Sequence, residues 1–241
     1  MNQIKNILYL GWLGKGNVGD DVLFELFKTM FYKYHKSKDN SIVNIDAHPS
    51  INNYKIDLSF YDLIVLGGGS LFNISYYIKI CAEGIKNQIP IVTWGTGVDG
   101  FFKNEDLKSI KLNDNNPNYK EILDKFNYIS VRGPFTKKML RSLGVSNRIH
   151  EIGDPALIYS NELIGKQIVK PNTTKKNILI NWGTSYNNIF GKDEYKVEQI
   201  LAETIRKLIS RGFKITVYPI WTEDIEPVKR LVQTVNNDRC Q

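Results

Sequence analysis

The fold is decided by residues 9–21, which are Tyr-Leu-Gly-Trp-Leu-Gly-Lys-Gly-Asn-Val-Gly-Asp-Asp. An apolar run leads into four glycines, and Asp20 and Asp21 then open a segment with helical spacing. A buried strand, a loop with few side chains and a helix N-terminus leave backbone N–H groups exposed at the edge of a pocket. Because the two carboxylates would repel phosphate, we expect a polar ligand with hydroxyl groups here.

Four further short apolar runs also end at glycine. They are residues 63–66, 91–94, 128–131 and 150–152. The segments that follow them are Gly67-Gly68-Gly69-Ser70, Gly95-Thr96-Gly97, Arg132-Gly133-Pro134 and Gly153-Asp154-Pro155-Ala156. Helical spacing between these runs predicts parallel strands joined by crossover helices, hence an α/β fold with a doubly wound parallel sheet. Ligands bind such sheets outside the carboxyl ends of the strands, where every glycine segment is expected.

A further strand is predicted at residues 41–45, followed by a loop formed by residues 46–49. His48 is in this loop, where ligand-binding groups often occur, but we expect a surface histidine without a role. Helices are predicted at residues 22–34, 74–86 and 135–143. Residues 101–118 are rich in Asn, Asp and Lys and predict an irregular exposed insertion with at most one short helix.

The pattern of strands and helices predicts two domains. Residues 1–165 would form a Rossmann-like first domain, ending in a polar linker over residues 160–176. Strands predicted at residues 178–180 and 215–218 alternate with two helices and begin a second Rossmann-like domain, residues 166–241. Two strand–helix units cannot cover both faces of a sheet or form much of a core, so we expect this domain to be incomplete. Alternatively, these units extend the first domain.

Composition excludes several classes of protein. The formal charge of +7 comes from scattered Lys and Arg, which predict solvated helix faces or a preference for anionic substrates or a negative membrane surface. No nucleic-acid motif is present. The two cysteines form no disulfide framework or zinc spacing, which favours a reducing, cytoplasmic setting. No signal peptide or span of about 18 apolar residues is apparent, so any membrane association would be peripheral.

Taken together, the motifs resemble those of the polysaccharide pyruvyl transferase family. The matches keep the family's order and spacing over residues 7–157. They are Gly14, Asn17, Gly19 and Asp20; Gly67, Gly68, Gly69 and Ser70; Gly95 and Gly97; Ser130, Val131 and Arg132; Leu140, Leu143 and Gly144; and Gly153 to Ala156.

The resemblance implies an enzyme with two Rossmann-like halves, similar to the GT-B architecture of glycosyltransferases. It would transfer a pyruvyl group from phosphoenolpyruvate to two hydroxyls of one sugar, forming a ketal on a cell-surface polysaccharide or its lipid-linked precursor. Phosphoenolpyruvate is the donor substrate, and no metal or other cofactor is expected. The expected partners are phosphoenolpyruvate and an acceptor glycan, without nucleic acid. We expect a cytoplasmic enzyme, with peripheral contact at the inner face of the membrane if its acceptor is lipid-linked.

The chemistry assigns roles to two residues. Phosphoenolpyruvate carries a carboxylate and a phosphate, which arginine binds best because its guanidinium is bidentate. Arg132, at a strand end, is the candidate for this role, although it could equally pair with a structural carboxylate. Asp20 is the candidate catalytic base or acceptor-sugar ligand, and its alternative role is to cap a helix N-terminus.

The remaining substrate-binding candidates are loop residues. They are Gly14, Asn17, Gly19, Gly67, Gly68, Gly69, Ser70, Gly95 and Gly97. Asn17 has the alternative of stabilising its own loop through its side chain. Asp154 is expected to be structural, fixing the entry to the linker.

One motif that the resemblance implies has no match. Family members carry an Arg-x-His motif late in the second half, expected to bind phosphoenolpyruvate and supply the acid. The only such spacing here, Arg148-Ile149-His150, is in the first part of the chain, and we interpret it as coincidence. We therefore expect the chain to hold only part of an active site.

Two other functions compete with this prediction. One is a sugar-nucleotide glycosyltransferase of GT-B type, and the other is a truncated, non-catalytic sugar-binding protein. A dinucleotide-binding oxidoreductase is disfavoured, because the first loop lacks the Gly-x-Gly-x-x-Gly order directly after the strand.

Overall fold

The computed structural model describes residues 4–35, 43–49, 56–98, 119–159, 176–183 and 193–241. The chain divides into two compact units. The first comprises residues 1–14 and 19–166, and the second comprises residues 15–18 and 167–241. Each unit has its own hydrophobic core.

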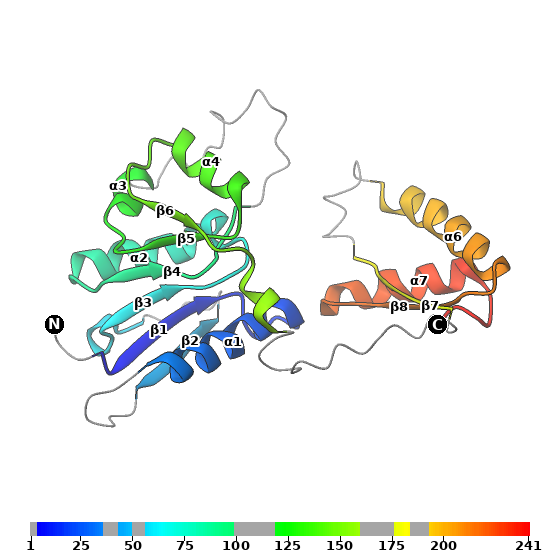
Figure 1. The fold of residues 1–241 in the computed structure, drawn as a ribbon, viewed down its shortest axis with the longest axis horizontal. Helices are drawn as coiled ribbons and strands as arrows, with labels where there is room; N and C mark the ends of the chain where they lie inside the picture. The colour runs from blue at the N-terminus through cyan, green and yellow to red at the C-terminus, as the bar shows by residue number, and fades with distance from the viewer. Residues whose placement is uncertain (1–3, 36–42, 50–55, 99–118, 160–175, 184–192) are drawn as a thin grey trace. The chain divides into compact units, whose positions relative to one another are not determined.

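The first unit is a mixed α/β structure built on a parallel sheet (Figure 1). Four strands pair in the order β2-β1-β3-β4. Their bounds are Asn6–Gly11 for β1, Asn44–Pro49 for β2, Leu63–Leu66 for β3 and Ile91–Thr93 for β4. Parallel bridges from Val92 to Tyr128 and from Thr96 to Val131 continue the pairing to β5 (Ile129–Val131), which pairs with β6 (Ile149–Glu151). The carboxyl ends of all these strands therefore face the same way.

Helices pack on both faces of this sheet. Their bounds are Val18–Tyr34 for α1, Ser75–Lys86 for α2, Tyr119–Asp124 for α3 and Pro134–Ser142 for α4. On one face, Phe27 of α1 packs with Tyr9 and Val65 of the strands. On the other face, Leu8 and Leu10 pack in a larger cluster with residues of α2, α3 and α4. The strands are continuous apolar runs because both faces of the sheet are buried.

The structure corrects the position of β2. The sequence predicted a strand at residues 41–45 and a loop over residues 46–49, whereas the strand is Asn44–Pro49. Since β2 lies at the edge of the four-stranded sheet, apolar and polar residues alternate along it, and this alternation was mistaken for a loop. His48 is consequently part of a strand. Helix α3 was not predicted, and the insertion at residues 101–118 lies outside the described residues.

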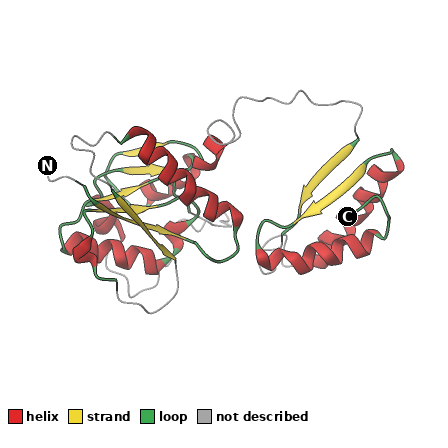
Figure 2. Ribbon diagram, turned by 90° about the horizontal axis from the view of Figure 1, so that it is seen from below, coloured by secondary structure: helices red, strands yellow, loops and turns green. Residues whose placement is uncertain are grey.

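In the described residues of the second unit, two parallel strands pack with two α-helices (Figure 2). Their bounds are Asn177–Asn181 for β7, Glu194–Ser210 for α6, Lys214–Tyr218 for β8 and Ile225–Val235 for α7. Pro227 is in the first turn of α7, where its missing N–H has no intrahelical partner to lose. Residues 15–18 belong to this unit: the Trp221 Nε1 donates to the Lys15 carbonyl at 2.9 Å, and the Val18 N–H donates to the Ile220 carbonyl at 3.1 Å.

A buried ion pair joins the two helices of the second unit. The Glu198 side chain is 2% exposed and accepts hydrogen bonds from Arg230 Nε at 2.7 Å and from the Trp182 Nε1 at 3.0 Å. Arg230 also pairs with Glu194 at 3.0 Å. Glu198 and Arg230 therefore tie α6 to α7 and to the residue that follows β7.

Candidate functional site

Arg132 lies at the centre of the candidate site, directly after β5. Its backbone N–H donates to the Thr96 carbonyl at 3.1 Å, so its position depends on the end of β4. Its Nη2 donates to the Ser70 hydroxyl at 3.0 Å, and its Nη1 lies 3.5 Å from a carboxylate oxygen of Asp154. Arg132 therefore contacts the segments that follow β3, β4 and β6 in the first unit.

The ion pair with Asp154 leaves N–H donors of the Arg132 guanidinium available. The two side chains are 38% and 35% exposed, and an ion pair of that exposure stabilises a protein little. The Asp154 carboxylate also accepts from the Ala156 N–H at 2.9 Å, which caps the short 3₁₀ helix Pro155–Ile158 and accounts for the structural role predicted for Asp154. A guanidinium has five N–H donors, so Arg132 retains donors for an anionic ligand.

Two glycines allow the backbone to approach both Arg132 and Asp20. The Gly97 N–H donates to the Gly69 carbonyl at 2.7 Å. A Cβ on Gly97 would lie 3.0 Å from Arg132 Nη2, and a Cβ on Gly69 would lie 2.9 Å from Asp20 Oδ1. Gly69 also has φ +89°, which side chains rarely adopt. A guanidinium and a carboxylate thus each lie against one of two hydrogen-bonded glycines.

Tyr9 lies beneath the glycine segment that follows β3. Its ring fills the space that a Cβ on Gly67 would need, and the Gly68 N–H donates a hydrogen bond to its hydroxyl. Burial raises the pKa of Tyr9 well above its usual value, and the charge of Asp20 raises it further, although the Gly68 hydrogen bond opposes the shift. The hydroxyl therefore stays protonated, close enough to Asp20 to sense its charge.

Hydrogen bonds between Thr93 and Ser130 connect the ends of β4 and β5. Both are buried; the Thr93 hydroxyl donates to the Ser130 carbonyl at 2.6 Å and accepts from the Ser130 N–H at 2.7 Å. The Gly95 N–H donates to the Ser130 hydroxyl at 3.2 Å. A Cβ on Gly95 would overlap Pro155, so glycine is required there as well. These contacts fix the segments that carry Gly97 and Arg132.

The remaining predicted residues have these positions. Asp20 is the third residue of α1, so it lies in the first turn and does not cap the helix, and Gly19 is the second residue. The Gly14 N–H donates to Asp21 Oδ1 at 3.3 Å. Asn17 belongs to the second unit, where its backbone forms an antiparallel bridge with Trp221.

Comparison with known proteins decides the family. The family model for polysaccharide pyruvyl transferases matches residues 17–236, which is most of the chain. The chain belongs to the polysaccharide pyruvyl transferase family. The resemblance predicted from the sequence motifs is therefore confirmed.

The other comparisons add little. A glutamine amidotransferase from Thermotoga maritima is 18% identical, with a TM-score of 0.27, and the similarity covers 38% of this chain and 39% of that chain. A similarity of this size supports no argument about fold or function. Comparison with curated proteins gives no match.

Within this pyruvyl transferase family member, the structure groups eight of the predicted site residues in the first unit. They are Asp20, Gly67, Gly68, Gly69, Ser70, Gly95, Gly97 and Arg132. The sequence analysis missed the contribution of Tyr9, because it lies within an apolar strand, where a tyrosine resembles any other core residue. The reciprocal Thr93 and Ser130 bonds were also missed. The presence of polar Thr93 and Ser130 in otherwise apolar strands could have indicated these bonds.

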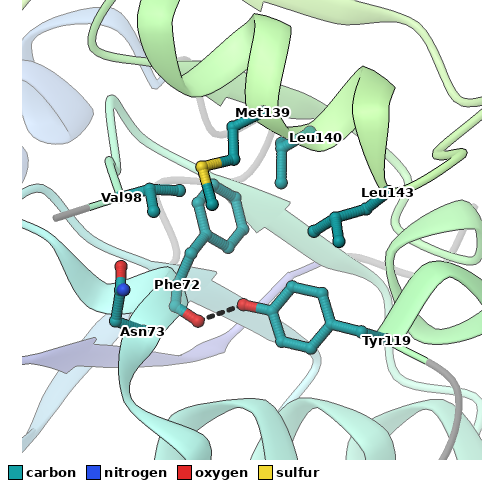
Figure 3. A pocket seen from close by; sticks show the side chains of 7 residues that line it. All are labelled: Phe72, Asn73, Val98, Tyr119, Met139, Leu140 and Leu143. Atoms are coloured by element: carbon teal, nitrogen blue, oxygen red, sulfur yellow. Dashed lines mark hydrogen bonds between the residues drawn. The ribbon is translucent and has the colours of Figure 1, made fainter. Parts of the chain in front are cut away.

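Two cavities in the first unit are unsuited to the substrate. An apolar cavity of about 10 Å³ lies between Phe72, Tyr119 and Met139, where the Tyr119 hydroxyl donates to the Phe72 carbonyl (Figure 3). It has room for at most one water molecule. A cavity of about 580 Å³ is lined by Asp62 and Pro90, which precede β3 and β4, so it lies at the amino ends of the strands and not at the candidate site.

No group of three or more His, Cys, Asp and Glu side chains suited to a metal ion occurs among the described residues. None of the helices that those residues form is both long and apolar enough to cross a membrane.

Proposed function

We propose that this chain binds phosphoenolpyruvate and an acceptor sugar at the carboxyl ends of β1, β3, β4 and β5, and takes part in pyruvyl transfer between them. The observation that supports this proposal is that Arg132 lies against Gly97 and Asp20 against Gly69, two glycines joined by a backbone hydrogen bond. A cation and a carboxylate at one edge of the sheet suit a reaction between an anionic donor and a neutral sugar.

The proposed reaction joins two hydroxyl oxygens of one sugar to C2 of phosphoenolpyruvate. The C3 methylene gains a proton and becomes a methyl group, and the bond between C2 and the phosphate oxygen breaks. One hydroxyl proton balances the new methyl group and the other leaves with inorganic phosphate. An acid near C3 and a base near the hydroxyls are therefore required.

Arg132 would bind the carboxylate or the phosphate of the donor. Charge-assisted hydrogen bonds from a guanidinium are about twice as strong as neutral ones, and Ser70 holds the guanidinium in place from one side. The glycine segments beside it carry no side chains that would block the donor.

Asp20 would bind an acceptor hydroxyl and accept its proton. Its carboxylate lies beside Gly69, while the Arg132 guanidinium lies beside Gly97. Tyr9, whose hydroxyl stays protonated nearby, would hold the glycine segment against which Asp20 rests.

The architecture is proposed on the same grounds. Residues 1–165 would form a Rossmann-like domain and residues 166–241 would belong to a second one, together resembling the GT-B arrangement. Support comes from the βα pattern of both units. We also propose a cytoplasmic enzyme, in peripheral contact with the membrane when its acceptor is lipid-linked, that needs no cofactor besides its donor substrate.

The experiment is release of inorganic phosphate from phosphoenolpyruvate, measured with and without an acceptor glycan. The proposal predicts release that depends on the glycan, together with formation of a pyruvate ketal seen by the methyl signal in an NMR spectrum. Consumption of a nucleotide sugar in place of phosphoenolpyruvate would contradict the proposal and favour a glycosyltransferase.

A further inference from the structure

His48 and Tyr76 form a side-chain pair that the proposed reaction does not use. The His48 Nε2 lies 2.6 Å from the Tyr76 hydroxyl, and the two rings stack with centroids 5.8 Å apart and planes 29° apart. Both side chains are only partly buried, so the pair is accessible to a ligand. This is the only hydrogen bond that either side chain makes among the described residues.

The pair lies at the same edge of the sheet as the candidate site. His48 pairs in register with Leu10, the residue before the glycine-rich loop begins, and neighbouring strands lie about 4.8 Å apart. Tyr76 lies in the first turn of α2, next to Tyr77, whose hydroxyl donates to the Gly11 carbonyl at 2.6 Å. The pair is thus connected to the opening loop from two sides.

The hydrogen-bonding chemistry of the pair matches a hydroxyl group. If the Tyr76 hydroxyl donates to Nε2, the imidazole presents an Nδ1–H donor and the tyrosine oxygen keeps an acceptor position. If Nε2–H donates instead, Nδ1 becomes the acceptor and the tyrosine O–H becomes the donor. Either way the pair offers one donor and one acceptor, which can bind two different hydroxyls of a sugar. Burial lowers the pKa of His48, which favours the neutral imidazole in which this exchange operates.

A cavity of about 250 Å³ adjoins Tyr76. Its walls are Ile56, Leu58, Tyr76, Lys79, Ile80 and Glu83. The lining combines apolar side chains with the charged Lys79 and Glu83, and this combination suits a sugar ring, which has apolar C–H faces and polar edges. The volume lies just below the roughly 300–1,000 Å³ of typical small-ligand sites, which suits a single sugar.

We infer that the His48–Tyr76 pair and the cavity beside Tyr76 form a subsite for the acceptor glycan, which binds a sugar next to the one that receives the pyruvyl group. This inference rests on the proposed function. The pair would set which glycans are accepted, and it would take no part in the transfer itself. One hydroxyl of the neighbouring sugar would bind Nδ1 of His48, and another would bind the Tyr76 oxygen.

The test uses Tyr76→Phe and His48→Gln, with Tyr61→Phe as the matched control. Tyr61 also hydrogen bonds to β2, through Asp46 Oδ2 at 3.1 Å, but it does not line the cavity. Each full chain is titrated with depyruvylated oligosaccharides of two to four sugars, prepared from the producing cell's own surface polysaccharide. The loss of one hydrogen bond should weaken binding about threefold to tenfold in the two test variants and leave it unchanged in the control.

Two results would overturn the inference. One is wild-type affinity in both test variants, and the other is the absence of oligosaccharide binding to the wild-type chain. A thermal unfolding midpoint that falls equally in all three variants, with binding unaltered, would show that the pair only attaches β2 to α2. A failure of the proposed function can be distinguished from a failure of this inference. In that case the chain would still bind the oligosaccharides but would release no phosphate from phosphoenolpyruvate.

Discussion

The Nη2 of Arg132 donates a hydrogen bond to the hydroxyl of Ser70 at 3.0 Å, which joins two residues 62 positions apart. The contact orients the guanidinium toward the glycine segments after β3 and β4. Asp154 alone would hold the guanidinium weakly, because its carboxylate lies 3.5 Å from Arg132 Nη1 and both side chains are partly exposed. The Ser70 hydrogen bond adds a second point of attachment. The candidate anion site is therefore built from three strand ends and not from one loop.

Gly97→Ala should weaken phosphoenolpyruvate binding without unfolding the chain. The new Cβ would lie 3.0 Å from Arg132 Nη2 and 3.3 Å from Nε, which forces the guanidinium to move. Weakening one hydrogen bond to a charged group predicts a loss of affinity of roughly tenfold. Titration calorimetry measures it. The control is Gly133→Ala, since its Cβ would meet nothing within 4 Å and its φ of −171° is ordinary extended backbone. Equal affinities in the two variants would contradict the role of Arg132.

Tyr9→Phe should destabilise the glycine segment after β3. The substitution removes the hydroxyl to which the buried Gly68 N–H donates, and an unpaired buried donor costs about 1–3 kcal/mol. Exchange of the Gly68 amide hydrogen should become faster by the corresponding factor. Tyr128→Phe serves as the control, because Tyr128 is 43% exposed and its ring stacks on His150. An unchanged Gly68 exchange rate would show that the Tyr9 hydroxyl does not hold this segment.

Asp124→Asn should lower the thermal stability at neutral pH but not at acid pH. Desolvation opposes the shift, but hydrogen bonds from Lys120, Asn147 and Ser146 outweigh it and hold the pKa of Asp124 well below its usual 3.8. A carboxyl whose pKa is depressed by folding stabilises the protein above the unfolded pKa, and this stabilisation is lost as pH falls through the folded pKa. The difference in unfolding midpoint between variant and wild type should therefore shrink as pH drops below about 4.

A difference that stayed constant from neutral to acid pH would contradict this assignment. Asp238→Asn, at an exposed position, controls for the general loss of one negative charge.

Glu198→Gln should strongly destabilise the second unit. Glu198 is 2% exposed and accepts from Arg230 and Trp182. Removing one partner of a fully buried ion pair costs about 3–5 kcal/mol, and because Arg230 is 32% exposed we expect a smaller loss here. Hydrogen exchange of the backbone amides of α6 and α7 measures this loss. Glu194→Gln removes the more peripheral partner of Arg230 and should cost less. A larger loss for Glu194→Gln than for Glu198→Gln would overturn this ranking.

The sequence predicted the core strands well for a physical reason. Residues 63–66 form an uninterrupted apolar run because both faces of β3 are covered, and the glycines after it are required by Tyr9 and Asp20. The same signal predicted β4 and the glycine segment containing Gly97. Parallel pairing then places these segments at one edge, so the composition of the candidate site could be predicted without knowing any contact.

Contacts between strand ends could not be predicted in the same way. The hydrogen bond between Arg132 and Ser70 depends on strand order and on rotamers, neither of which is encoded locally. The predicted position of β2 was wrong because polar residues, including His48, interrupt the apolar run that identifies a buried strand. The partner of His48, Tyr76, is 28 residues away on a helix, and for that reason His48 was expected to have no role.

The central claim is that Arg132 binds the donor, and titration of the full chain with phosphoenolpyruvate tests it most directly. The account predicts saturable binding to the wild type and to Arg148→Gln, where an exposed arginine precedes β6. It predicts binding at least about tenfold weaker in Arg132→Gln, because charge-assisted hydrogen bonds to the anion are lost. Equal affinity in Arg132→Gln and Arg148→Gln, or no saturable binding to the wild type, would contradict the claim.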